Sequence, residues 1–390
     1  MKLILLLMAL LIALGFWETA RHRWYLRRIP VRVHVNGSRG KSSVARLIAA
    51  GLRGGNLTVV AKTTGSAAAM IHSDGSETPI VRRGGANIRE QLKVIRDAVR
   101  EDCQALVIEC MAVRPDLQRV CEHHIVRSSH GVITNVRPDH LEVMGPTLED
   151  VAASLAGTIP RRSHLFHAED TFADYLAARA RGVGSRCTQA AAAEVSSEEM
   201  VGFGYVEFPE NVALALAVCE AAGVAREQAL TAMYRVQPDV GAMTLWPLAT
   251  DHGTVTFVNG FAANDPMSYL RIWERLKLAE RAQDVILVFN NRSDRMRRAK
   301  DLLPLFGREL PARRFVMIGE ATSLLVDILR RRQLPMDRVD DLAGRPAPEL
   351  WAKLAEFCPS GGLIIGIGNI KGIGNELLDY LRGRRLQEVA

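Results

Sequence analysis

The pattern of apolar and polar positions changes its period repeatedly along the chain, which is typical of strands that alternate with helices. Val31–Val35 alternates with the period of a strand, whereas the apolar residues of Ser42–Leu52 recur with the period of a helix. The same patterns predict strands at Thr58–Ala61, Ala105–Ile108 and Gly131–Thr134, and helices at Ile88–Arg100 and Asn211–Ala222. Strands and helices in this order predict an α/β fold with a parallel, doubly wound sheet.

Breaker residues at Val236–Gly241 predict a boundary between two domains. Beyond it the patterns predict strands at Val255–Val258, Val285–Phe289, Phe315–Ile318 and Leu363–Ile367, and helices at Ser268–Leu278, Leu324–Arg331 and Asn375–Arg384. We therefore expect a membrane helix with a basic patch at 1–28, a central P-loop domain at 29–238, and a smaller Rossmann-like C-terminal domain at 239–390.

The N-terminus carries an uncharged, largely apolar run of 15 residues, Leu3 to Trp17, with several arginines after it. About 20 residues are needed to cover the hydrocarbon core of a bilayer, so the run is short for a span. A cleaved secretory signal peptide is the alternative interpretation. Because positive charge after an apolar run favours the cytoplasmic side, we expect a single-pass anchor in the cell membrane with the two predicted domains in the cytoplasm.

The formal net charge is +7 and the isoelectric point is near 9.2. Such a balance indicates either an anionic partner or an arginine-rich solvated surface. No basic stripe interleaved with aromatic residues is present, so we expect no nucleic-acid partner. The six cysteines form no CxxC pair, which predicts a reducing compartment and no disulfide framework.

A glycine-rich loop between a predicted strand and a predicted helix carries the strongest chemical signal. It consists of Gly37, Ser38, Arg39, Gly40, Lys41, Ser42 and Ser43. Backbone N–H groups and a helix N-terminus at such a loop cradle phosphates, Lys41 reaches the β- and γ-phosphates, and Ser42 ligates Mg²⁺. The general phosphate loop has four residues between its glycines, whereas this one has two. The alternative, a turn with an exposed lysine, does not explain the strand and helix on either side.

The shortened loop resembles that of Mur ligases and folylpolyglutamate synthetases, which carry Gly-x-x-Gly-Lys-Ser/Thr. Glu109 ends the strand Ala105–Ile108, where the resemblance implies a Mg²⁺ ligand, and open α/β sheets bind ligands at this edge. Thr134–Glu142 resembles the Thr-Asn-x-x-x-Asp-His segment of the family, which implies that His140 helps to bind a second Mg²⁺. A surface acid and a structural histidine are the alternatives.

Two segments of the second predicted domain also resemble this family. Asn259–Pro266 is similar to a segment that ends in His-Asn-Pro, with the histidine absent, and Asn290–Arg295 is similar to its Asp-Arg turn. The resemblance implies nucleotide contacts at Asn264, Asp265, Arg292, Asp294 and Arg295. It also implies that Arg295 acts on the γ-phosphate, for which a planar guanidinium is suited. Taken singly, these segments are equally typical of exposed polar loops.

The match is closer with one subfamily, the ligase subunits of poly-γ-glutamate synthases. It is carried by Thr63–Gly65, Glu109–Val113, Val143–Thr147, Gly241–Met243, Phe257–Asp265 and Gly366–Ile370. The resemblance implies ATP-dependent formation of γ-glutamyl amide bonds through an acyl phosphate, with release of ADP and phosphate. It further implies ATP and Mg²⁺ as cofactors, and glutamate and the poly-γ-glutamate chain as substrates. The expected partner is an integral-membrane synthase subunit, in an oligomeric membrane complex.

One departure weakens the assignment of His140. Many family members hold the second Mg²⁺ with a carbamylated lysine, but Leu148–Ala173 contains no lysine. The segment Gly366–Lys371 misses the third glycine of the dinucleotide fingerprint, which argues against NAD. Two rival functions remain at this point: another amino-acid ligase of the Mur or folyl type, and a nucleotide-gated membrane scaffold.

Overall fold

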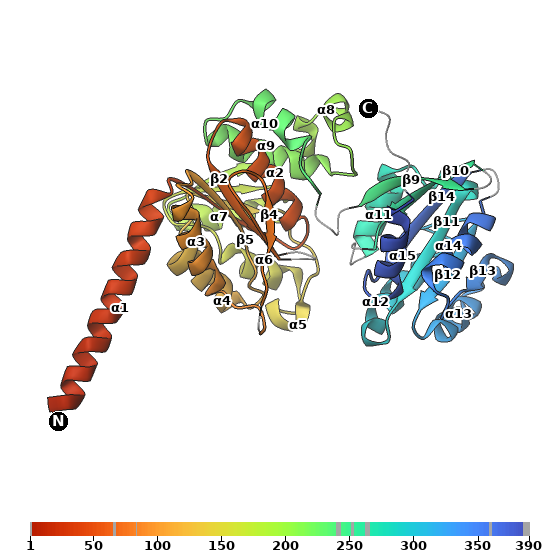
Figure 1. Ribbon diagram of the computed structural model, residues 1–390, viewed down its shortest axis with the longest axis horizontal. Helices are drawn as coiled ribbons and strands as arrows, with labels where there is room; N and C mark the ends of the chain where they lie inside the picture. Colours follow the sequence, from red (N-terminus) through yellow and green to blue (C-terminus); the bar gives the residue numbers. More distant parts are fainter. Residues whose placement is uncertain are drawn as a thin grey trace. The chain divides into compact units, whose positions relative to one another are not determined.

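The computed structural model describes residues 2–64, 68–82, 84–238, 243–250, 253–261, 266–358 and 361–384. The chain divides into two compact units, Met1–Val240 and Gly241–Ala390, and each is built around one sheet (Figure 1). The predicted α/β class is confirmed in both units.

The sheet of the N-terminal unit has the order β4-β3-β2-β5-β1-β6-β7-β8. Its strands are β1 Val31–Asn36, β2 Val59–Thr63, β3 Ala69–Ile71, β4 Glu77–Pro79, β5 Ala105–Glu109, β6 His130–Ile133, β7 His164–His167 and β8 Arg186–Gln189. In the sheet order, β2, β5, β1, β6, β7 and β8 each pair in parallel with their neighbours. Strands β3 and β4 extend the β2 edge of the sheet and pair in antiparallel orientation. The sequence patterns predicted the four-residue strand β6 but not β3, β4, β7 and β8, which are equally short or shorter.

Both faces of this sheet are buried, as alternation along β5 shows. Ala105 and Val107 belong to a core with α2, α9 and α10, while Leu106 and Ile108 point into a second core with α3. The helices are α1 Lys2–Arg28, α2 Lys41–Gly54, α3 Glu90–Arg100, α4 Pro115–Val120, the π-helix η1 Cys121–Val126, α5 Leu141–Met144, α6 Leu148–Ala156, α7 Ala173–Gly182, η2 Ala192–Glu194, α8 Ser197–Val201, α9 Pro209–Ala221 and α10 Arg226–Met233. Helices on both faces make the sheet doubly wound.

The sheet of the C-terminal unit has the order β13-β12-β11-β14-β10-β9. Its strands are β9 Thr244–Thr250, β10 Gly253–Asn259, β11 Val285–Asn291, β12 Arg314–Gly319, β13 Val339–Asp341 and β14 Gly362–Gly368. Its helices are α11 Pro266–Arg275, η3 Ala282–Asp284, η4 Ser293–Arg295, α12 Met296–Leu302, η5 Leu303–Leu305, α13 Thr322–Arg331, η6 Met336–Arg338, α14 Ala347–Glu356 and α15 Ile373–Arg382. Only β9 runs antiparallel to its neighbour among the described strands of this sheet.

The apolar N-terminal run continues as one helix through the arginines that follow it. Helix α1 has 27 residues and is long and apolar enough to cross a membrane, and its apolar side chains are exposed. Only its last turns contact the rest of the unit: Leu26 is buried, and the His22 Nε2 atom lies 2.8 Å from the Ile125 carbonyl oxygen. A helix with so much exposed apolar surface needs a cover from outside the described chain.

Candidate active site

The phosphate loop connects β1 to α2 and requires glycine at both of its ends. Gly37 and Gly40 have φ angles of 131° and 79°, in the region that favours glycine. A Cβ atom on Gly37 would lie 2.0 Å from the Thr134 hydroxyl oxygen, so the close approach of the two segments excludes any side chain there. Helix α2 begins at Lys41 without a side-chain cap, which leaves its first N–H groups available to an anion.

Lys41 folds back across the loop that precedes it. Its ammonium group donates to the Gly37 carbonyl oxygen at 2.6 Å and to the Ser38 carbonyl oxygen at 3.1 Å. The cation is thus held at the mouth of the loop by two weak, neutral acceptors, which phosphate oxygens can replace with stronger charge-assisted bonds. Ser43, in the same first turn of α2, is half-buried.

Glu109 joins the loop to the neighbouring strand. Its Oε2 atom accepts a hydrogen bond from the Ser42 hydroxyl at 2.9 Å and another from the Thr64 N–H at 2.6 Å. Burial raises the pKa of this carboxyl group, against the lowering effects of Lys41, Thr64 and Ser42. A divalent cation between Ser42 and Glu109 would offset that cost of burial, so both residues fit the predicted Mg²⁺ site.

The segment after β6 supports the phosphate loop from the other side. The Ser38 hydroxyl donates to the Arg137 carbonyl oxygen, and the Arg137 N–H donates to the Ser38 hydroxyl, each at 2.9 Å. The Arg39 N–H donates to the Asn135 side chain at 3.1 Å, and the Arg39 guanidinium lies 3.4 Å from Asp139. Most of the Thr-Asn-x-x-x-Asp-His string therefore shapes the loop, a role that the sequence analysis did not predict.

His140 stands apart from these contacts. It adopts a left-handed conformation with φ 43°, its side chain is 51% exposed, and its Nδ1 atom lies 3.1 Å from the Glu142 carboxylate. The structure thus brings together Lys41, Ser42 and Glu109, and it leaves His140 at the exposed start of α5.

A second group of polar side chains, Asn211 and Glu207, lies beneath the phosphate loop and was missed by the sequence analysis. The Asn211 side-chain oxygen lies 2.9 Å from the position that a Cβ atom on Gly40 would take, and the Asn211 amide donates to Glu207 at 2.8 Å. Burial raises the pKa of Glu207, and its second carboxylate oxygen has no hydrogen-bond partner in the described structure. The only signal in the sequence is that polar residues begin the otherwise apolar helix α9.

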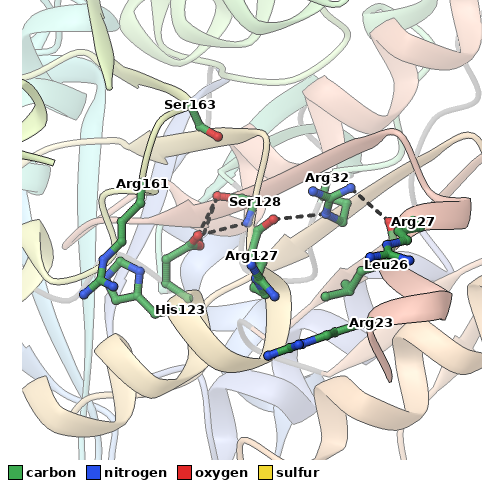
Figure 2. A pocket seen from close by; sticks show the side chains of 10 residues that line it. Arg23, Leu26, Arg27, Arg32, His123, Arg127, Ser128, Arg161 and Ser163 are labelled. Carbon is green, nitrogen blue, oxygen red and sulfur yellow. Dashed lines mark hydrogen bonds between the residues drawn. The ribbon is translucent and has the colours of Figure 1, made fainter. Parts of the chain in front are cut away.

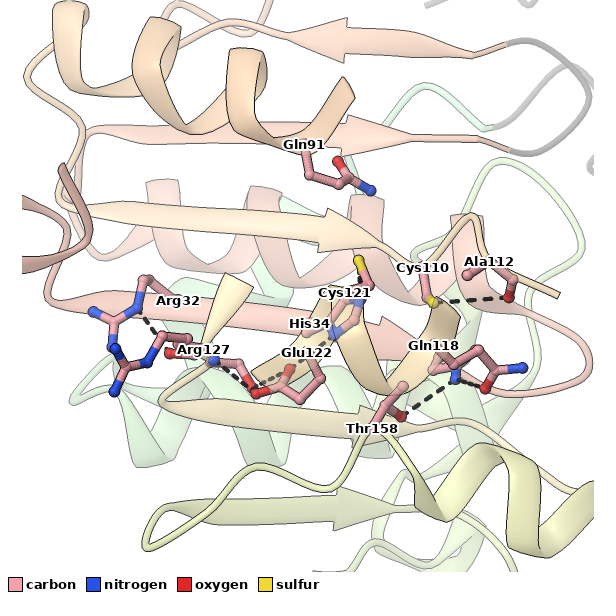
Figure 3. Close-up of polar contacts among 12 residues, drawn as sticks. Arg32, His34, Gln91, Cys110, Ala112, Gln118, Cys121, Glu122, Arg127 and Thr158 are labelled. Atoms are coloured by element: carbon pink, nitrogen blue, oxygen red, sulfur yellow. Dashed lines mark hydrogen bonds and ion pairs between the residues drawn. The ribbon is translucent and has the colours of Figure 1, made fainter. Parts of the chain in front are cut away.

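A buried polar cluster lies on the side of the sheet that α3 covers (Figure 3). One of its members, Cys110, directly follows Glu109 in the sequence. The His34 Nδ1 atom lies 2.8 Å from the Glu122 carboxylate, and Cys121 lies 3.8 Å from the other ring nitrogen. Burial alone would lower the pKa of His34, but Cys110 and Glu122 outweigh it and raise the pKa to about 10. The imidazolium and carboxylate form an ion pair that fixes the π-helix η1 against β1.

The predicted nucleotide contacts of the C-terminal unit follow β11. Arg292 donates to Asp294 at 2.8 Å, and the Arg295 N–H donates to the Arg292 carbonyl oxygen at 3.0 Å within η4. Arg292 also lines a cavity of about 380 Å³, together with Arg345 and Lys371, at the carboxyl ends of β11, β12 and β14. The predicted contacts Asn264 and Asp265 lie outside the described residues.

Comparison with known proteins identifies relatives over the whole chain. Residues 35–181 match the family of the Mur ligase middle domain, and residues 245–384 match the poly-gamma-glutamate synthase CapB C-terminal domain. The capsule biosynthesis protein CapB of Bacillus anthracis is 38% identical over 95% of this chain and 80% of its own length. The PGA synthase CapB of Bacillus subtilis (strain 168) is 35% identical over 100% of both chains.

Solved structures of related folds are more distant in sequence. The folylpolyglutamate synthase of Thermotoga maritima superposes with a TM-score of 0.65 at 14% identity, over 98% of both chains. The bifunctional folylpolyglutamate synthase/dihydrofolate synthase of Yersinia pestis, solved with AMPPNP and a Mn ion, has a TM-score of 0.68 at 13% identity, over 93% of this chain and 92% of that one. MurF of Acinetobacter baumannii has a TM-score of 0.67 at 14% identity, over 94% of this chain and 80% of its own chain. These structures show the shared fold.

Proposed function

Since this chain belongs to the CapB family of poly-γ-glutamate synthases and contains a Mur ligase middle domain, we propose that it joins glutamate units through their γ-carboxylates. It is an ATP-dependent amide ligase. The observation that best supports the proposed chemistry is the contact of Ser42, in the phosphate loop, with the buried carboxylate of Glu109. A nucleotide's phosphates and a metal ion both find suitable groups at this one edge of the sheet.

ATP is held by the loop and the start of α2. The free N–H groups of α2 point toward the loop, and Lys41 exchanges the carbonyl oxygens of Gly37 and Ser38 for oxygens of the β- and γ-phosphates. The contacts of Ser38 and Arg39 with the segment after β6 keep the loop in this shape before ATP arrives. Such preorganisation reduces the cost of binding in the reactive geometry.

Mg²⁺ would be held by the Ser42 hydroxyl and the Glu109 carboxylate. The hydrogen bond of 2.9 Å between them already brings these two oxygen groups together at the phosphate loop. When bound, the ion supplies positive charge to the phosphate oxygens during phosphoryl transfer. His140 and its neighbour Glu142 enter no step here, because the chain has no lysine at 148–173 to complete a second metal site.

The reaction proceeds in two steps that overcome the poor electrophilicity of a carboxylate. A glutamate γ-carboxylate attacks the γ-phosphorus, a C–O–P linkage forms, and ADP leaves. The amine of a second glutamate unit then attacks the acyl carbon, the C–N bond forms, and phosphate leaves as the amine loses a proton. Lys41 stabilises the charge that develops on the phosphoryl oxygens, and we assign a similar part to Arg292 and Arg295.

The apolar helix α1 anchors the chain in the cell membrane with both units on the cytoplasmic side. Its exposed apolar residues also offer a surface to an integral-membrane subunit that carries the growing chain outward. Glutamate, poly-γ-glutamate and this subunit are therefore the proposed partners, in an oligomeric membrane complex.

Product analysis tests the chemistry directly. Membranes that contain the full chain are given ATP, Mg²⁺ and labelled D- or L-glutamate, with hydroxylamine added to trap the acyl phosphate. We expect γ-glutamyl product, a hydroxamate when hydroxylamine is present, and ADP with phosphate. AMP with pyrophosphate would mean adenylation instead, and ATP hydrolysis without amide product would favour a nucleotide-gated scaffold.

A further inference from the structure

A cavity of about 580 Å³ opens where α1 meets the N-terminal unit, and arginines line it on several sides (Figure 2). Arg23 and Arg27 come from the last turns of α1, and Arg32 comes from β1. Arg127 follows η1, and Arg161 precedes β7. Five guanidinium groups from segments far apart in the sequence thus surround one space.

This cavity is separate from the phosphate loop. Arg32 is the second residue of β1, and Ser128 and Ser163 precede the parallel strands β6 and β7, so the cavity lies at the amino-terminal edge of the sheet. The phosphate loop follows the carboxyl-terminal end of β1, which is six residues, or about 20 Å, away along the strand. A ligand in the cavity is therefore neither the nucleotide nor the reacting carboxylate.

The positive charge of the cavity is not neutralised from within. Across the described ranges, Arg23, Arg27, Arg127 and Arg161 form no ion pair with a carboxylate. In the described structure the Arg32 guanidinium donates only to carbonyl oxygens, of Arg127 at 3.0 Å, Leu26 at 3.0 Å and Ile29 at 2.6 Å.

Glu122 is the carboxylate in the lining, and it is already satisfied. It is paired with His34 at 2.8 Å (Figure 3), and it accepts from the Ser128 N–H at 2.9 Å and from the Ser128 hydroxyl. Because the Glu122 carboxylate is directed at His34 and Ser128, it forms no ion pair with the arginines of the lining within the described ranges, and their excess charge remains. The cavity therefore suits an anion.

The walls of the cavity are fixed to each other. Arg32 binds both the end of α1, at the Leu26 carbonyl, and the loop after η1, at the Arg127 carbonyl. His22 adds a contact from α1 to the Ile125 carbonyl at 2.8 Å, and Leu26 is buried. The position of α1 and the shape of the cavity are thus set by the same contacts.

The depth of α1 in a membrane indicates the source of the anion. The apolar run ends at Trp17, whose ring carries the Arg21 guanidinium 4.2 Å from its centre, an arrangement suited to the membrane interface. Arg23 follows Trp17 by six residues, about 9 Å along the helix, and Arg27 by about 15 Å. The head-group layer is about 5–8 Å thick on each side of a bilayer, which places Arg23 at its outer boundary and Arg27 beyond it, so the cavity opens at the surface of the head groups.

We propose, on the premise that α1 anchors the chain as proposed above, that this cavity binds the phosphodiester head group of an anionic phospholipid from the leaflet beside it. The bound head group bridges α1 to the amino-terminal edge of the sheet. It thereby holds the N-terminal unit against the membrane in one orientation, with the phosphate loop on the opposite edge of the sheet, away from the lipid.

The test uses the full chain purified in a nonionic detergent, so that lipid binding is measured without membrane insertion or ligase turnover. Dihexanoyl-phosphatidylglycerol is titrated while binding is followed by native mass spectrometry. Dihexanoyl-phosphatidylcholine, inorganic phosphate and a γ-glutamate oligomer are titrated in parallel. The pocket variant Arg127→Gln/Arg161→Gln leaves α1 intact and keeps the Arg127 carbonyl that Arg32 requires. The control Arg181→Gln/Arg235→Gln removes the same charge from exposed positions of the same unit.

We expect phosphatidylglycerol to bind the wild-type chain and the control equally, and the pocket variant about 25-fold more weakly, at about fivefold per arginine. The single variant Arg27→Gln, on the opposite wall, should weaken binding about fivefold. The proposal is overturned if the pocket variant binds the lipid as tightly as the control does. It is also overturned if phosphate, phosphatidylcholine or the γ-glutamate oligomer binds the wild-type chain as tightly as phosphatidylglycerol. Loss of anchoring or of ligase activity would change none of these results.

Discussion

The Ser42 hydroxyl donates a hydrogen bond of 2.9 Å to the Glu109 carboxylate, although 67 residues separate the two in the chain. The contact exists because β1 and β5 are parallel neighbours, so the loop after one and the last residue of the other meet at the same edge. A phosphate-binding helix start and a buried acid are thereby placed in one site.

Replacement of Lys41 by alanine should remove ATP-dependent activity and leave the fold intact. Among the described residues, the Lys41 ammonium donates only to carbonyl oxygens of its own loop, and the side chain is half-buried, so its loss creates no buried cavity. The expected fall in the rate of glutamate ligation is about 10²–10³-fold, as for a lost transition-state donor. The rate is compared with that of Lys93→Ala, a lysine on α3 outside the site. Wild-type turnover in a well-folded Lys41→Ala protein would remove Lys41 from the site.

Glu109→Gln should raise the Mg²⁺ concentration needed for half-maximal activity, because an amide is a poorer ligand for a hard cation. We expect a shift of at least about tenfold, and a smaller one for Ser42→Ala, which removes a neutral ligand. The measurement is a Mg²⁺ titration of ligation at saturating ATP. Superimposable titration curves for Glu109→Gln and the wild-type chain would contradict the assignment of Glu109.

His140→Ala should have a weaker effect than Glu109→Gln on the same Mg²⁺ titration. The His140 ring is exposed and faces Glu142, and the chain lacks the lysine that accompanies this histidine in many relatives. The comparison protein is His124→Ala, an exposed histidine in η1. If His140→Ala shifts the Mg²⁺ requirement as far as Glu109→Gln does, a second metal site must form around His140 by another route.

Removal of residues 2–20 should release the protein from the membrane while ATP binding persists. The deleted part of α1 makes no buried contact, whereas His22 and Leu26, which dock the helix end, are retained. Cell fractionation and nucleotide binding measure the two properties, and polymer outside the cell measures export. Full export by the truncated protein would show that the anchor is dispensable, and a mature chain cleaved near Ala20 outside the cell would refute the cytoplasmic orientation.

The His34–Glu122 pair should make stability depend on pH in a defined direction. Cys110 and Glu122 raise the pKa of His34 from 6.5 to about 10, so these contacts stabilise the fold fully below pH 6.5 and lose this contribution as the pH rises through 10. His34→Gln leaves Glu122 buried without its cation and should cost about 3 kcal/mol at pH 6.

Thermal unfolding of the full chain at pH 6 and pH 9 checks this prediction. The stability deficit of His34→Gln relative to the wild-type chain should be smaller at pH 9, because the histidine of the unfolded chain has lost its proton there and folding must take one up. His124→Gln serves as the exposed control and should show no deficit at either pH. A deficit that grows with pH would have the wrong sign for the ion pair.

Long, strongly periodic segments could be predicted from the sequence because their own composition determines them. β1, α2, β5 and β11 each bury a regular set of apolar residues, and the predicted α/β class is confirmed. The strands β7 and β8 could not be predicted, because four residues such as Arg186–Gln189 carry no periodic signal. They form because β7 pairs with the edge that β6 offers and β8 pairs in turn with β7.

The sequence by itself determined the phosphate loop and the apolar N-terminal helix, because neighbouring residues suffice to specify a glycine turn, a helix start and a hydrophobic run. Only the tertiary structure decided that Asn211 and Glu207 lie beneath Gly40, that Ser38 is held by Arg137, and that Arg127 and Arg161 meet the end of α1. These contacts join residues that are far apart in the chain. Their formation depends on the order of the parallel strands, which brings distant loops to the same edge of a sheet and which no local pattern encodes.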